Sequence, residues 1–227
     1  MIGYYDYTVI LTYLSLVSAC AGVMISLDGG GHPFYGALFL MICGLCDAFD
    51  GTVARSKKNR TEKEREFGVQ IDSLSDLVAF GVLPACIGIA LHRREQFGGA
   101  SILGNIPKIV VVLIGAAFVL CALIRLAYFN ITVEETQGKQ ANGKKFYFGL
   151  PVTSAALIFP ACLLLIHFFK QLSFLYYILL VVVAILFITK FRLKKPTMKE
   201  VCMMVGFGAL EFLIIMFVII WMRRRFL

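Results

Sequence analysis

Seven apolar stretches of about 20 residues each constrain this chain more than any other feature of its sequence. We place them near residues 8–27, 33–54, 70–91, 107–131, 151–169, 172–189 and 198–222. A stretch of this length spans the hydrocarbon core of a bilayer as an α-helix. The connecting segments are short and leave no room for a soluble domain. The sequence therefore predicts an all-α, polytopic integral membrane helix bundle that forms a single membrane domain over residues 1–227.

The composition agrees with a membrane location. The chain is 59% hydrophobic and only 16% charged, and its mean hydropathy of +0.84 is too high for an ordinary soluble domain. Its net charge of +8 could indicate a nucleic-acid partner, yet the basic residues lie in the segments between apolar stretches rather than on a soluble basic face. Membrane topology and anionic lipid explain that charge better, so we expect no nucleic-acid partner.

Four aspartates stand inside the otherwise apolar second and third stretches. Asp47 and Asp50 are three residues apart and Asp72 and Asp76 are four apart, so on helices each pair falls on one face. An aspartate at membrane depth costs about 2.5 to 3.5 kcal/mol even on lenient insertion scales. Something held between the four carboxylates should neutralise them, and a divalent metal is the simplest candidate.

Side chains with oxygen ligands and no accompanying His or Cys cluster favour hard cations such as Mg²⁺ or Mn²⁺, which in enzymes usually serve phosphates. Small residues at Gly51, Ala54 and Gly68 share the carboxylate faces, so a bulky ligand can approach the backbone there. Arg55 could contact a diphosphate. A metal pair would polarise the phosphoryl group, while a spare carboxylate could take a proton from an attacking alcohol.

The distribution of Lys and Arg indicates where this stretch lies. If the N-terminus is cytoplasmic, the cytoplasmic segments hold twice as many Lys and Arg residues as the opposite side. The bias places the aspartates near the cytoplasmic face of the cell (inner) membrane. The run Arg223–Arg225 opposes this bias and leaves the path of the last stretch open.

Three further basic residues are candidates for substrate or phosphate contacts. Arg125 lies deep in an apolar stretch, where it could snorkel, pair with a site aspartate or contact an anion. Lys144 and Lys145 precede Phe148-Gly149-Leu150-Pro151, a signal for the start of a helix. A basic loop there suits a phosphate or a lipid head group, although charge bias alone would also produce it.

A cation-coupled transporter is the alternative from another class, because intramembrane acids also serve ion pathways. Against it, the acids lie near one interface rather than at mid-membrane, and the sequence shows no inverted repeat or broken helix pair.

Eight positions of the aspartate stretch carry a fixed spacing. They are Asp47, Asp50, Gly51, Ala54, Arg55, Gly68, Asp72 and Asp76. This pattern resembles the signature of the CDP-alcohol phosphatidyltransferase family, and the resemblance extends over a core of about residues 8–189. It implies a six-helix catalytic core with one additional C-terminal helix at about 198–222. The twelve residues 56–67 between the two halves are more than the family pattern usually has, which should lengthen the connection without moving the aspartates.

Within the family, three segments are most similar to the phosphatidylserine synthases. They are IDSLSDLVAFGVLPA after Gly68, RLAYFN from Arg125, and FGLP from Phe148. This likeness implies a role in phospholipid biosynthesis, with CDP-diacylglycerol as donor, L-serine as acceptor, CMP as leaving product and two divalent ions as cofactor. Other acceptors such as inositol or glycerol 3-phosphate remain alternatives with the same chemistry.

The family's roles carry over residue by residue. The resemblance implies that Asp47, Asp50 and Asp72 are metal ligands, and that Asp76 both ligates the second ion and acts as general base. The residues expected to line the CDP site are Asp47, Gly51, Ala54, Arg55 and Gly68. Family members are commonly homodimers, so we expect a homodimer here too.

Overall fold

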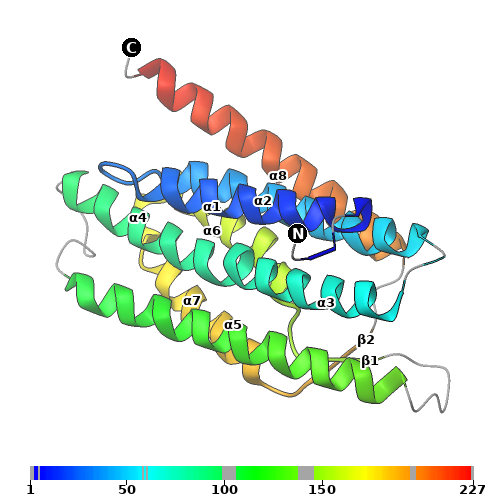
Figure 1. Ribbon diagram of the computed structural model, residues 1–227. Coiled ribbons are helices and arrows are strands. Elements are labelled where there is room, and N and C mark those ends of the chain that lie inside the picture. The colour runs from blue at the N-terminus through cyan, green and yellow to red at the C-terminus, as the bar shows by residue number, and fades with distance from the viewer. Residues whose placement is uncertain are drawn as a thin grey trace.

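Eight α-helices make up most of the computed structural model, which describes residues 3–4, 6–57, 59, 61–98, 106–137, 146–194 and 198–225. The helices are α1 (Ile10–Leu27), α2 (Pro33–Ser56), α3 (Glu62–Asp76), α4 (Leu83–Gly98), α5 (Lys108–Gln137), α6 (Ala155–Phe168), α7 (Leu175–Ile188) and α8 (Met198–Arg225). Short helical turns are η1 (Tyr7–Val9), η2 (Leu77–Val82), η4 (Val152–Ser154) and η5 (Lys170–Leu172). Because the π-helical turn η2 joins α3 to α4 without a break, these three elements form one long rod (Figure 1).

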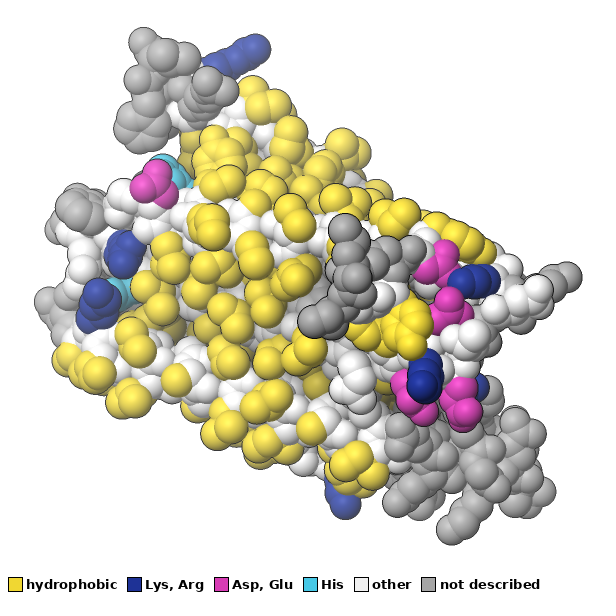
Figure 2. Space-filling model, viewed as in Figure 1, with side chains coloured by type: hydrophobic (Ala, Val, Ile, Leu, Met, Phe, Trp, Pro, Cys, Tyr) yellow, Lys and Arg dark blue, Asp and Glu magenta, His cyan; other side chains and the backbone are white. Residues whose placement is uncertain are grey.

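Five of the described helices are long and apolar enough to cross a membrane by length and composition. They cover Tyr7–Leu27, Pro33–Ser56, Glu62–Gln96, Lys108–Ile131 and Met203–Met222. Two further apolar helices, Val152–Phe168 and Leu175–Ile188, are shorter. Figure 2 shows hydrophobic side chains across the middle of the visible face, with most of the charged side chains gathered toward its two ends. The protein is therefore an integral membrane protein.

Each of the seven predicted apolar stretches coincides with a helical segment, and the all-α polytopic fold is confirmed. The third segment is longer than predicted, because the helix begins at Glu62 rather than near residue 70. Thr61 starts it with a capping box, in which its Oγ1 accepts from the backbone N–H of Glu64 at 3.3 Å and its own N–H donates to the Glu64 carboxylate at 2.8 Å.

Large aromatic side chains fill the centre of the bundle. Phe80, Phe118, Phe159 and Tyr176 have no exposed surface. The buried Tyr176 hydroxyl donates to the carbonyl of Pro84 at 2.9 Å, so its polar end is satisfied where water is absent. These side chains tie α4, α5, α6 and α7 into one core.

Close approach of small residues packs α2 against its neighbours. A Cβ at Gly44 would lie only 2.5 Å from the Cβ of Ala156 on α6, and one at Gly36 would lie 2.6 Å from Ile87 on α4. Small residues at these crossings let the helix backbones approach, as is usual between membrane helices. The second helix is thereby fixed between α4 and α6.

Two short strands, which the sequence analysis did not predict, join distant parts of the chain. β1 (Phe146–Phe148) pairs in antiparallel fashion with β2 (Arg192–Lys194), Tyr147 opposite Leu193. The pairing holds the segment before α6 beside the segment after α7. Both strands lie at the end of the bundle where α3 begins (Figure 1).

The last helix lies on the outside of the bundle. α8 packs against α2 and α6 and diverges from them toward its C-terminal end (Figure 1). Large apolar side chains along it, among them Phe207, Leu213 and Phe217, are exposed. This helix follows the core as an additional segment and does not contribute any of the four aspartates.

Candidate functional site

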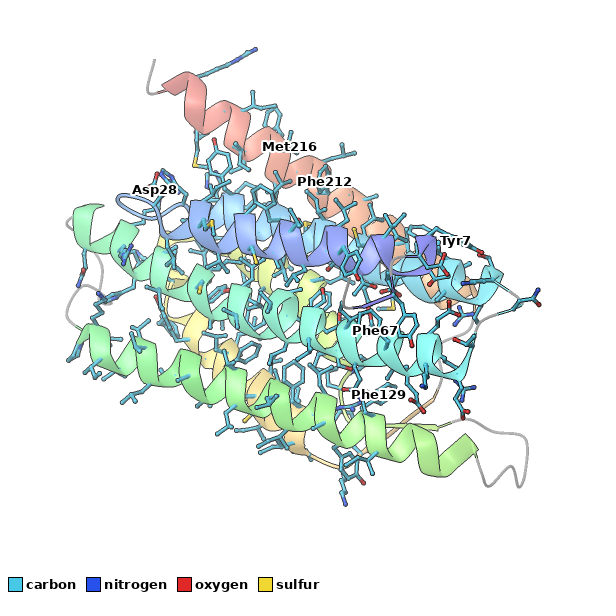
Figure 3. All side chains as sticks on the ribbon, in the orientation of Figure 1. Tyr7, Asp28, Phe67, Phe129, Phe212 and Met216 are labelled. Carbon is cyan, nitrogen blue, oxygen red and sulfur yellow. The ribbon has the colours of Figure 1, made fainter. Side chains whose placement is uncertain are left out.

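The four aspartates lie where α2 ends and the α3 rod begins. Asp47 and Asp50 are in the C-terminal half of α2, and Asp72 and Asp76 are in the last two turns of α3. In Figure 3, Tyr7 and Phe67 mark this end of the bundle and Asp28 marks the opposite end. The helices therefore bring both carboxylate pairs to one end, as their spacing predicts.

Three of the four carboxylates come together. One oxygen atom from each of Asp47, Asp50 and Asp72 lies within 4.8 Å of the other two, and all three side chains are half-buried. The side chains of Asp47 and Asp50 on α2 thus approach that of Asp72 on α3. Carboxylate oxygens in such a group can bind a hard divalent cation.

Asp76 is the most deeply placed of the four. Its side chain is buried, and it interacts electrostatically with Asp47, Asp72 and Asp50 without belonging to the group within 4.8 Å. The preceding residue anchors this turn, because Ser75 Oγ donates to the carbonyl of Thr12 on α1 at 3.2 Å. The structure thus holds one carboxylate beside the group of three, at its inner edge.

The small and basic residues of the predicted CDP site lie on the same two helices. Gly51 and Ala54 are half-buried on α2, and Gly68 is half-buried on α3, one turn before Asp72. The Arg55 side chain is exposed and folds back over Gly51, where an added Cβ would lie 3.3 Å from its Nη1. The side chain nearest to an added Cβ at Gly51 is thus a flexible one that a ligand could displace.

Arg125 is buried in the bundle on α5, with only 6% of its surface exposed. Its Nε donates to the carbonyl of Leu150 at 3.2 Å, and its guanidinium stacks over the Phe129 ring at 5.2 Å. Among the described residues, the ion pairs within 4.0 Å all belong to Lys57, so Arg125 has no carboxylate partner there. Of the alternatives that the sequence left open for Arg125, pairing with a site aspartate is therefore not the one seen among the described residues.

Sequence reasoning missed a polar contact between α3 and α5. Asn130 Nδ2 donates to Ser73 Oγ at 2.9 Å, one residue from Asp72. Asn130 was part of a segment used for the resemblance, but a lone amide at the end of an apolar stretch gives no sign of its partner. This contact fixes α5 beside the aspartate-bearing turn.

The N-terminal segment is fastened to the connection between α2 and α3. Lys57 Nζ lies 2.6 Å from the Asp6 carboxylate and 3.1 Å from that of Glu64. These hydrogen bonds, first that to Asp6 and then that to Glu64, raise the pKa of the Lys57 ammonium. Tyr4 also packs edge-on against Phe67, with ring centroids 5.6 Å apart. Lys57 and Glu64, which lie near the two ends of the connection, are thus held together with the N-terminal segment.

Lys144 and Lys145, the remaining candidates for phosphate contacts, lie outside the described residues. The described residues that follow them are β1, Gly149 and Leu150, and the carbonyl of Leu150 accepts from Arg125 Nε.

Residues 8–189 match the family described as CDP-alcohol phosphatidyltransferase, a match that includes α1 to α7 and ends before α8. A CDP-diacylglycerol–serine O-phosphatidyltransferase of Saccharomyces cerevisiae is 38% identical over 157 residues, which is 67% of this chain and 51% of the relative.

Two prokaryotic relatives are similar over much the same length. The archaetidylserine synthase of Methanothermobacter thermautotrophicus is 29% identical over 163 residues, 70% of this chain and 59% of its own. A CDP-diacylglycerol–serine O-phosphatidyltransferase of Helicobacter pylori is 32% identical over 145 residues, 63% of this chain and 52% of its own. The chain spans about half the length of the curated relatives it matches.

Proposed function

This chain belongs to the CDP-alcohol phosphatidyltransferase family, and we propose that it transfers the phosphatidyl group of CDP-diacylglycerol to the hydroxyl of L-serine. The products would be phosphatidylserine and CMP, a step of phospholipid biosynthesis. The observation that carries the proposal is the meeting of Asp47, Asp50 and Asp72 within 4.8 Å, inside the segment that matches the family. The names of the relatives supply the choice of serine as acceptor.

The carboxylates fit the divalent metal that this reaction would need. Their ligand atoms are all oxygens, come from two helices and are close enough to share a hard cation. We propose that Asp47, Asp50 and Asp72 hold two Mg²⁺ or Mn²⁺ ions, with Asp76 as a further ligand of the second. When bound, such ions neutralise the diphosphate and make its phosphorus more electrophilic.

The donor's CDP part would lie along the faces of α2 and α3 that carry the small residues. The half-buried backbone at Gly51, Ala54 and Gly68 lets a nucleotide approach closely. Asp47 lies on the same face of α2, and the exposed Arg55 can turn toward the diphosphate. We assign these five residues to CDP binding.

Asp76 is our candidate for the proton acceptor. It would remove the proton of the serine hydroxyl as the hydroxyl oxygen forms its bond to the phosphatidyl phosphorus, while the bond from that phosphorus to CMP breaks and CMP leaves with the electron pair. Its buried position beside the group of three carboxylates suits this role. The surrounding apolar core would keep water from competing with serine.

The distribution of Lys and Arg residues supports a position for the site in the membrane. We propose that the protein lies in the cell (inner) membrane with the aspartates near the cytoplasmic face, because the basic segments beside them would then be cytoplasmic. We also propose a homodimer, on the resemblance to the family alone.

Replacing Asp50 or Asp76 by Asn tests the chemistry. Each variant, purified in detergent with CDP-diacylglycerol, serine and Mg²⁺ or Mn²⁺, should release CMP at least about 100-fold more slowly than the wild-type protein. Asp28→Asn is the matched control, because Asp28 is a carboxylate at the opposite end of the bundle (Figure 3). Normal CMP release by Asp50→Asn or Asp76→Asn would refute the site.

The acceptor is tested by competition. CDP-diacylglycerol is incubated with the wild-type protein and an equimolar mixture of serine, inositol and glycerol 3-phosphate, and the lipid product is identified by mass spectrometry. Phosphatidylserine as the main product supports the proposal. Another lipid would keep the chemistry and change the acceptor.

A further inference from the structure

We propose that the Arg125 guanidinium binds the carboxylate of the acceptor, so that this site selects a hydroxy-amino acid over a neutral alcohol. The inference rests on the proposed function and deepens it, because it assigns the recognition of serine to one residue. Three observations carry it: the burial of Arg125 with no counter-ion among the described residues, its level relative to Asp76, and the backbone that holds it.

A buried arginine without a carboxylate is costly, because guanidinium loses its hydration and gains no opposite charge in return. Arg125 is 94% buried, and its one hydrogen bond to a described residue uses Nε alone. A guanidinium has five N–H donors in a planar fork. Among the described residues, the Nη1 and Nη2 groups of Arg125 have no hydrogen-bond acceptor. They are therefore available to a ligand, and a planar anion such as a carboxylate matches their geometry.

The register between α5 and the α3 rod places Arg125 at nearly the same level as Asp76 along the helix axis. Asn130 bonds to Ser73, and a Cβ at Gly81 would lie 3.3 Å from that of Ala122. Between the two contacts the chain goes back eight residues on α5, from Asn130 to Ala122, and forward eight residues on the rod, from Ser73 to Gly81. The two helices therefore run antiparallel and in register. Arg125 then lies opposite residue 78, about 3 Å along the helix axis from Asp76.

The two groups are level with each other but do not form an ion pair. The acceptor of this proposal presents its hydroxyl to Asp76 and its anionic group to Arg125. In L-serine the hydroxyl oxygen and the carboxylate are separated by only two carbon atoms. The proposed substrate therefore carries both groups within one small molecule.

The guanidinium is held from behind by the backbone around Gly149. Gly149 has φ +77°, a conformation that other residues rarely adopt, and its N–H donates to the carbonyl of Phe191 at 2.8 Å. A Cβ there would lie 3.4 Å from Arg125 Nε and 3.2 Å from the carbonyl oxygen of Thr189. The segments before α6 and after α7 thus fix the guanidinium before the ligand arrives, which lowers the entropic cost of binding.

The donor's diphosphate is the other anion that could reach Arg125. The observations favour the acceptor, because Arg55 already lies beside Gly51 on a helix proposed to bind CDP, while Arg125 is on α5, which carries none of the residues proposed to bind CDP. If Arg125 binds the acceptor, a variant should raise the KM for serine. If it binds the donor, the variant should raise the KM for CDP-diacylglycerol.

The test compares L-serine with L-serinamide, which keeps the hydroxyl and amino groups and lacks the negative charge. For Arg125→Gln we expect the KM for serine to rise about 100-fold, the loss expected for a charge-assisted contact. The kcat/KM for serinamide and the KM for CDP-diacylglycerol should each change less than threefold. Arg125→Lys should recover part of the preference for serine.

Arg93→Gln is the matched control. Arg93 donates to the backbone carbonyl of Leu27 at 2.6 Å at the other end of the bundle, so it shares the chemistry of Arg125 but not the site. Its loss should leave the preference for serine over serinamide unchanged. Thermal unfolding in detergent reports on the folding of each variant.

Three outcomes would overturn the inference. Arg125→Gln could keep the wild-type preference, could lose activity with both acceptors equally, or could raise the KM for CDP-diacylglycerol instead. If the wild-type protein uses serine in these assays, any of them refutes the role of Arg125 and leaves the proposed function standing. If the wild-type protein releases CMP only with a neutral alcohol, the choice of serine is wrong and the inference fails with it.

Discussion

The two sides of the α3 rod hold opposite charges that are kept apart. Toward α2, three carboxylates lie within 4.8 Å of one another, and Asp76 is beside them. Toward α5, the buried Arg125 contacts a backbone carbonyl and an aromatic ring. A bundle built only for stability would pair such charges, because an unpaired buried ion is costly. We therefore propose that ligands complete both sides.

The two sides of the rod would have separate tasks in the proposed reaction. The carboxylate side would set the chemistry, since it suits divalent ions and a diphosphate. The guanidinium side would set the choice of acceptor. Changes on the first side should abolish turnover with every acceptor, whereas changes on the second should alter the ranking of acceptors.

The largest effect is expected from removing divalent metal. Treatment with EDTA should lower CMP release about 1,000-fold with any acceptor, because several kcal/mol of transition-state stabilisation would be lost. Added Mg²⁺ or Mn²⁺ should restore it. Asp72→Asn should need a higher metal concentration for half-maximal rate, measured by titrating metal into the apoprotein. Full activity in EDTA would show that the carboxylates serve another purpose.

A smaller and more selective effect is expected at Gly149. Gly149→Ala places a Cβ at φ +77°, which costs about 1–2 kcal/mol, and brings it 3.4 Å from Arg125 Nε. We expect the midpoint of thermal unfolding to fall by about 2–8 °C and the KM for serine to rise more than the KM for CDP-diacylglycerol.

The control for this variant is Gly206→Ala. An added Cβ at Gly206 on α8 would meet no atom within 4 Å, so it should leave both Michaelis constants unchanged. If Gly149→Ala lowered stability and left the KM for serine at its wild-type value, the link between this backbone and the guanidinium would be broken.

The sequence predicted what depends on local spacing. Apolar stretches give the helices, and carboxylates three or four residues apart on neighbouring helices meet at one end of a hairpin, as Asp47, Asp50 and Asp72 do. The start of α3 at Glu62 also has a local signal, the Thr61-x-x-Glu64 capping box, but its residues are polar and therefore lie outside the apolar stretch.

Contacts between distant positions could not be predicted in this way. Asn130 and Ser73 are 57 residues apart, and each is an ordinary polar residue near the end of a helix. The pairing of β1 with β2 involves strands of three residues, too short to show a period of two. The neighbours of Arg125 depend on the conformation of Gly149, which the sequence alone leaves free. The proposed roles of Lys144 and Lys145 stay predictions.

Removing the contact between Asn130 and Ser73 should have a modest effect, and it should act on both the carboxylate side and the guanidinium side of the rod. In a double-mutant cycle, Asn130→Ala and Ser73→Ala should show a coupling free energy of unfolding of about 1 kcal/mol. Because this contact sets the register between α5 and the aspartates, both single variants should lower kcat with serine more than they change the KM for CDP-diacylglycerol. Strict additivity in urea unfolding would show that the hydrogen bond does not tie α5 to α3.

The smallest effect is expected at Lys57, which joins Asp6 and Glu64 at the surface. Lys57→Met should lower the unfolding midpoint slightly, and the difference should shrink as NaCl is added, because salt screens exposed ion pairs. The pKa of Lys57 is raised above its ordinary value of 10.5, so its contribution to stability is fully present below that pH and is lost only as pH rises through the higher, folded-state pKa. Between about pH 6 and 9 the difference between the two proteins should therefore stay constant. A difference that fell with pH inside this window would mean that another group, and not Lys57, controls how the N-terminal segment is held beside the carboxylate side.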